Sequence, residues 1–384
     1  MLPRVACICL LFAAGVGGLS AKEPRQIRES GAAFVGSIGC KSSSCHGGAG
    51  PKRSQYTTWS RQDFHTKAYA VLLNARSERI AESLGIAAAQ SSARCTVCHS
   101  PLQSVAPNRL TRTAQPAEGV SCENCHGAAG GWLRGHTRPD WTYNTRIAAG
   151  MRDLRNLYVR ANACVACHQN LGSELLKAGH PDLFFELDGQ SVAEPKHWRD
   201  EEPWNGLREW LTGQAVALRE MSWALANDPQ NDAFSIARWN GLAWLCATAT
   251  SVGSLPSPVS LPSSNPNLPE FARMQNESDA LAHRASVSTW NEGSARAMLT
   301  TLASVNAEFI EKGTATNLLA QRAKRLVLAL DRLANALNQN CGTRLKIDPE
   351  LNQLFEDVKT LDAFDASGFA GHLRNFRVAL EQNK

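Results

Sequence analysis

The chain has 384 residues, of which 43% are hydrophobic and 20% are charged, and its formal net charge is +5. So small a basic bias gives no case for a nucleic-acid partner, and we expect none. The unusual feature is the count of twelve cysteines.

The first residues have the pattern of a secretory signal peptide. An apolar stretch from Val5 to Val16 follows a short basic segment and leads to small residues. This pattern predicts a signal peptide over residues 1–21, cleaved near Ser20 or Ala21, and it is too short to anchor the mature protein. No later apolar run reaches the length of a membrane span, so we expect no span in the mature chain. The predicted location is therefore the periplasm or another exported compartment.

Four Cys-His motifs follow within residues 36–200. Three have the C-x-x-C-H spacing of covalent haem attachment, and the first has a longer C-x4-C-H spacing. In such a motif the thiols form thioethers to the porphyrin, and the histidine binds the iron. We therefore expect four covalent haem c groups in a tetrahaem domain over residues 36–200, after a linker at 22–35. The motifs are Cys40–Cys45–His46, Cys95–Cys98–His99, Cys122–Cys125–His126 and Cys164–Cys167–His168.

Zinc sites and redox disulfides also use C-x-x-C pairs. A zinc site would combine two such pairs and would not require a histidine directly after each. The first motif is the weakest, because a helix turns about 100° per residue and cysteines five apart do not share a face. Cys40 to Cys45 must therefore bulge, and the alternative is that only Cys45 is bonded.

The remaining cysteines are few. Cys7 and Cys9 leave with the signal peptide and eight belong to the motifs, so Cys246 and Cys341 are left. In an oxidising compartment these two could pair, or they could be separate inert thiols.

Six histidines remain outside the motifs, and some could supply a second axial ligand. A haem with two histidines is saturated and suits electron transfer, whereas an open iron suits catalysis. We expect ligands among the histidines near the motifs, and we expect His283 and His372 to be ordinary side chains. The candidate ligands are His65, His136, His180 and His197.

The two halves of the chain differ in composition. Residues 36–198 hold few long apolar stretches, so porphyrins would have to supply the missing core and folding would be coupled to attachment. Beyond them, residues 201–250 predict buried helices, 251–269 a Pro- and Ser-rich linker, and 270–384 a helical bundle. The fold class expected is mainly α, with a haem-packed domain before the bundle.

These features resemble the tetrahaem cytochrome c-554 family over about residues 36–200. The shared features are the motif order, His65-Thr66-Lys67-Ala68 after the first motif, and the string Gly119–Gly127 around the third. The resemblance implies three bis-histidine haems and one open haem at the second motif, with His65 and His136 as distal ligands. His180 is instead similar to a distal position of larger exported multihaem cytochromes, and the helical half has no counterpart in the small family members.

The leading hypothesis is an exported electron carrier that works between redox protein partners, with no catalytic residue assigned. The alternative is an oxidoreductase that uses one open haem on a small nitrogen or sulfur compound, because only three distal histidines are strong candidates for four irons. A third hypothesis makes the helical half a docking module, since its helices are rich in tryptophan. Core packing of those tryptophans is the competing interpretation.

Overall fold

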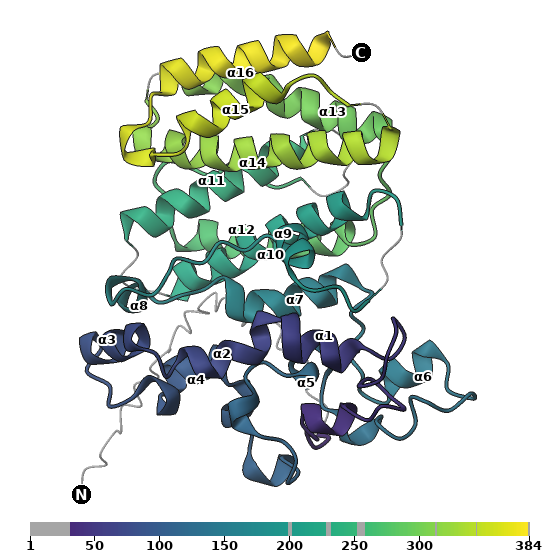
Figure 1. The fold of residues 1–384 in the computed structure, drawn as a ribbon. Helices are drawn as coiled ribbons and strands as arrows, with labels where there is room; N and C mark the ends of the chain where they lie inside the picture. Colours follow the sequence, from purple (N-terminus) through teal and green to yellow (C-terminus); the bar gives the residue numbers. More distant parts are fainter. Residues whose placement is uncertain are drawn as a thin grey trace, which may run out of the picture.

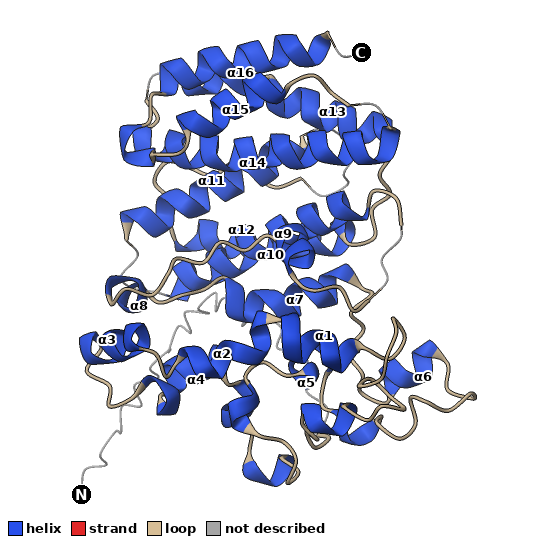
Figure 2. Cartoon of the chain, in the orientation of Figure 1, coloured by secondary structure: helices blue, strands red, loops and turns tan. Residues whose placement is uncertain are grey.

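In a computed structural model, the described part of the protein consists of helices joined by loops, with no strand drawn (Figure 2). Within it the only β contact is an isolated bridge between Phe34 and Leu110. The expected mainly α fold class is confirmed. The predicted signal peptide lies outside the described residues, which are 31–198, 202–227, 232–251, 258–311, 313–342 and 344–382.

The N-terminal half consists of short helices joined by loops and 3₁₀ turns. Its own apolar clusters are small, one around Phe34 and Leu102 and another around Leu72 and Ala81. Such small clusters agree with the prediction that this segment lacks a conventional hydrophobic core. The helices are α1 (Gln55–Gln62), α2 (Ala68–Val71), α3 (Ala75–Ser83), α4 (Ala93–His99), α5 (Cys122–His126), α6 (Tyr143–Ala148), α7 (Leu157–His168), α8 (Ser173–Lys177) and α9 (Leu187–Ala193).

The C-terminal half is a stack of longer helices that lies above the N-terminal half (Figure 1). Two large apolar clusters fill it, as the Ala- and Leu-rich sequence predicts. Gly342 ends α14 in the left-handed conformation (φ 67°), which glycine adopts without strain at the end of a helix. The helices are α10 (Asn205–Asn227), α11 (Ala233–Thr250), α12 (Leu268–Ala285), α13 (Glu292–Ala303), α14 (Thr316–Cys341), α15 (Asp348–Asp357) and α16 (Ala366–Glu381).

The tryptophans of this half pack mainly in its core. Trp210, Trp239 and Trp244 are at most 1% exposed. The Trp239 indole donates to Ser222 Oγ at 2.8 Å, and that of Trp244 donates to Glu308 at 2.6 Å. Core packing therefore accounts for these three, and they give no support to a docking module.

Helix α7 joins the two halves. Its Ala161 is buried in the same cluster as α10 and α12, although its last turn carries the fourth Cys-His motif. Tyr158 donates from its hydroxyl to Asp279 of α12 at 2.7 Å, and Arg160 pairs with Glu209 of α10 at 2.9 Å. The fourth motif is thus held by the helical half as well as by its neighbours.

Cys246 and Cys341 form no disulfide with each other in the structure; the first is buried in α11 and the second lies at the end of α14. Among the helices that the structure describes, none is both long and apolar enough to cross a membrane.

Helices α11 and α14 approach each other closely at Gly241, where a Cβ would lie 2.8 Å from the backbone carbonyl carbon of Gln321. Alanine normally favours a helix by about 1 kcal/mol over glycine. We expect Gly241→Ala to lower the melting temperature of the intact protein nonetheless, because the added methyl group meets backbone that cannot turn aside. Circular dichroism of thermal unfolding measures the effect.

The matched control is Gly371→Ala in α16, where an added Cβ meets no atom within 4 Å. That change should leave the melting temperature unchanged or raise it. The packing account fails if Gly241→Ala is as stable as Gly371→Ala.

Candidate functional site: four pairs of histidines

Three of the four Cys-His motifs lie on helices, and the first lies in a turn. The second, third and fourth motifs end α4, α5 and α7. Cys40 ends a 3₁₀ turn, and the chain then bends back so that His46 N donates to Cys40 O at 3.3 Å and Gly47 N to Ser42 O at 3.0 Å. The longer spacing therefore produces the bulge that the sequence predicts.

Each motif histidine faces one of the four candidate distal histidines. The ring centroids of every pair lie 6.0–6.4 Å apart, although the partners come from distant parts of the sequence. The sequence does not predict which distal histidine pairs with which motif histidine. Of the four candidate ligands, His197 has the weakest support from the sequence. The pairs are His46 with His136, His65 with His168, His99 with His180, and His126 with His197.

This separation suits one metal ion between two rings. Imidazole nitrogens about 2.0 Å from a metal on opposite sides place the ring centroids about 6.3 Å apart, whereas a tetrahedral site places them about 5 Å apart. All four separations match the first arrangement. The rings therefore fit the two axial positions of a haem iron and do not fit tetrahedral zinc.

The hydrogen bonds of these rings leave the metal-binding nitrogen free. In six of the eight, Nδ1 contacts an oxygen that can only accept, so Nδ1 carries the proton and Nε2 keeps its lone pair. The acceptors are Gln55 Oε1 for His46, Asp63 for His65, Ala68 O for His99, Leu133 O for His136, Pro181 O for His180 and Pro195 O for His197.

Burial also favours neutral imidazoles, which metal binding requires. Burial lowers the pKa of His126 to about 4, and it lowers the pKa of His99 and His168 below the ordinary value. The exception is His65, whose pKa is raised by the hydrogen bond from its ring to the Asp63 carboxylate. Asp63 and Glu194 lie with His65 in one acidic cluster.

The motif thiols meet across motifs. Cys40 lies close enough to Cys122 to act on its pKa, and Cys98 likewise lies close enough to Cys167. Cys125 of the third motif lies close enough to Cys164 of the fourth to act on its pKa. The motifs therefore form a row in the order first, third, fourth, second.

Two buried donors in residues 130–150 lack a hydrogen-bond partner among the described residues. They are Trp132 Nε1 and Arg146 Nε, and the Trp132 ring lies 5.4 Å from that of His136. Unpaired buried donors are rare and call for an explanation. A haem propionate supplies the kind of acceptor that they lack, so the residues present fit the cofactor.

Residues 31–127 match the family model described as cytochrome c554 and c-prime. No curated protein and no solved structure matches the chain. The cytochrome c554 match includes the first three motifs and His65, and it implies haem-based electron transfer through covalent haem c. It ends at Gly127, so His136, the fourth motif, His180 and His197 lie beyond it.

The family resemblance implies an open iron at the second motif. The structure brings His180 to His99 with a centroid separation of 6.3 Å, as close as in the other three pairs. The arrangement therefore favours a distal ligand at this motif too. The sequence could not reveal the pair, because 81 residues separate the two histidines.

Sequence reasoning missed the groups that orient the rings. Gln55 and Asp63 accept from ligand histidines, and Asp63 lies only two residues before His65. The position of Asp63 next to a candidate ligand is the sequence signal that could have identified it.

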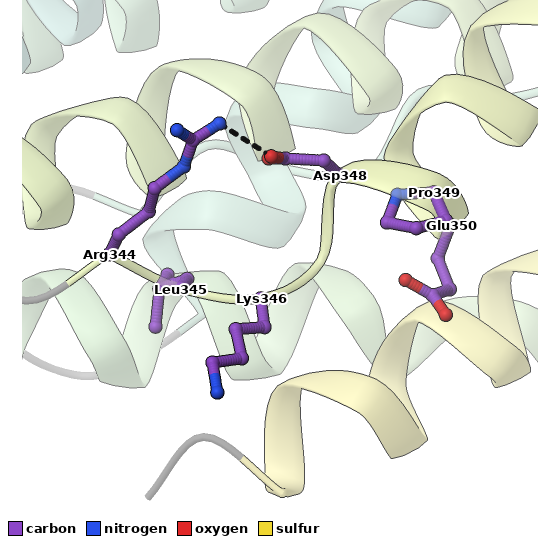
Figure 3. A pocket seen from close by; sticks show the side chains of 6 residues that line it. All are labelled: Arg344, Leu345, Lys346, Asp348, Pro349 and Glu350. Atoms are coloured by element: carbon purple, nitrogen blue, oxygen red, sulfur yellow. Dashed lines mark hydrogen bonds and ion pairs between the residues drawn. The ribbon is translucent and has the colours of Figure 1, made fainter.

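A surface pocket lies elsewhere, before α15 in the helical half (Figure 3). Arg344 and Asp348 form an ion pair at 2.6 Å beside it, and no cysteine or histidine lines it. Its lining therefore offers no ligand for a haem iron.

Proposed function

We propose that this protein is an exported tetrahaem cytochrome that passes single electrons between redox protein partners. The observation that carries the proposal is the presence of four histidine pairs, each with a separation that suits one iron. Export is supported by the predicted signal peptide.

The residues proposed to hold the haems are the motif cysteines and the eight paired histidines. Haem iron with two histidine ligands supplies reversible one-electron chemistry without an open coordination site. Carbonyl and side-chain oxygens fix the ring orientations through Nδ1. The cysteines are Cys40, Cys45, Cys95, Cys98, Cys122, Cys125, Cys164 and Cys167.

The domain organisation proposed follows from the same contacts. Residues 36–200 form the haem-binding domain, and the helical half supports it through α7. The enzyme alternative rested on a shortage of distal histidines. It is less well supported now, because each motif histidine has a partner ring.

The haem content is the first test. We expect the pyridine haemochrome assay to give four haems per chain, because eight thiols are available in four motifs. Intact mass should equal the mature chain plus four haem groups. One haem or none would contradict the proposal, and three would point to failure of the first motif.

The ligand assignment is tested with His180→Ala. The resting wild-type protein should show only low-spin ferric signals in EPR, because every iron has two histidines. The variant should lose one low-spin haem and gain a high-spin haem that binds cyanide.

The matched control is His372→Ala, which removes a histidine that contacts Asp357 at 2.8 Å in the helical half. It should keep the wild-type spectrum. A wild-type protein with a high-spin, cyanide-binding haem would contradict the assignment and support the enzyme alternative.

Asp63 is expected to lower the potential of one haem. Its buried carboxylate contacts His65 Nδ1 at 3.0 Å, whereas the other five Nδ1 acceptors described above are neutral amide or backbone oxygens. A charged acceptor makes the imidazole a stronger donor to iron, which stabilises the oxidised state. Asp63→Asn should therefore raise one of the four midpoint potentials in a spectroelectrochemical titration.

Asp357→Asn is the control, since Asp357 contacts a histidine outside the motifs. It should leave all four potentials unchanged. Equal shifts of every haem in Asp63→Asn, or no shift, would show that Asp63 has no specific effect on one iron.

A further inference from the structure

We infer that an acidic redox protein docks at the first-motif end of the row, on a cationic rim made of exposed side chains. This inference rests on the proposed function and adds to it the place of docking and the kind of partner. The rim consists of Lys41, Lys52, Arg53, Arg61 and Arg134.

The rim surrounds the first motif. Lys41 follows Cys40 directly, and Tyr56 N donates to His46 O at 2.9 Å, which folds the loop carrying Lys52 and Arg53 back on the motif. Arg134 lies two residues before His136, the partner ring of His46. Arg61 lies on α1, whose first residue, Gln55, contacts His46 Nδ1 at 3.1 Å. The other four cations therefore belong to one region of the surface, and α1 extends it to Arg61.

Two acids lie close to the first motif, and both accept hydrogen bonds from the backbone just before it. Glu118 accepts from Ser37 N at 2.8 Å, and the buried Glu123 accepts from Gly36 N at 2.7 Å. Residues 31–62 contain no Asp or Glu, and the first acid after them, Asp63, is buried and engaged with His65. None of the five cations lies within 4.0 Å of a carboxylate in the described ranges. Five positive charges also exceed the four negative ones of Glu118, Glu123 and the two carboxylates that one haem carries, so the region stays positive when loaded.

The opposite end of the row is balanced in charge. Around the second motif, Arg76, Arg79, Arg94 and Lys177 are interspersed with Glu78, Glu82 and Glu174. Arg94 pairs with Glu174 at 2.7 Å. In Figure 1, α3 and α4 of this end lie at one side of the base of the molecule, and α6, after His136, lies at the other.

The row of motifs has a positive surface at one end and a surface of mixed charge at the other. An acidic partner is therefore attracted to one end only. Complementary charge raises encounter rates by about 10- to 1,000-fold and orients the partner, while it adds less to affinity. An acidic electron carrier would thus be guided to the first motif.

The test measures haem reduction by reduced plant-type ferredoxin, an acidic protein used as probe, in an anaerobic stopped-flow instrument. The wild-type second-order rate constant should fall as salt rises, because salt screens the attraction. Lys52→Glu with Arg61→Glu should lower it by about tenfold at low salt. Neither residue belongs to a motif, so attachment should be intact.

The matched control reverses two exposed cations at the other end, Arg79→Glu with Lys177→Glu, and should keep the wild-type rate constant and salt dependence. Equal losses in both double variants, or none in the first, would overturn the docking site. So would binding to phosphatidylserine vesicles through Lys52 and Arg61 without any effect on the ferredoxin reaction. Failure of the proposed function itself is separate, because it appears beforehand as fewer than four haems or a high-spin iron.

Discussion

The structure depends on the spacing between paired histidine rings. Four pairs of rings, each with centroids close to 6.3 Å apart, bring together segments that are otherwise joined by loops and short helices. An isolated pair of imidazoles has little reason to stay at this distance, since no direct contact links the rings. In the proposed function, an iron bound by both rings supplies the reason. On this proposal the N-terminal half is organised around its cofactors more than around its own side chains.

The helical half has the opposite character. Its helices bury large aromatic and aliphatic side chains in two continuous clusters, which gives it a conventional core. Helix α7 belongs to both halves, because one face packs on α10 while its last turn carries a motif. The fourth motif consequently has a more rigid support than the first, which lies in an exposed turn. This difference fits the order of the row, in which the fourth motif lies in the middle and the first motif lies at an accessible end.

The sequence predicted the parts of this arrangement that depend on local patterns. The haem motifs follow from cysteine spacing, and the helices within residues 201–250 and 270–384 follow from composition and periodicity. The pairing of histidines could not be predicted, because it depends on how loops bring together residues such as His99 and His180. The family resemblance implied an open second iron and gave no reason to expect His180 there. The burial of the tryptophans was likewise undecided until the packing of α10, α11 and α14 was known.

Anomalous diffraction from crystals of the mature protein, at the iron and zinc absorption edges, tests the central claim most directly. Our account predicts four iron peaks, each between one motif histidine and its distal partner, including His99 with His180. Zinc peaks between cysteines, or a histidine pair with no iron between its rings, would contradict it.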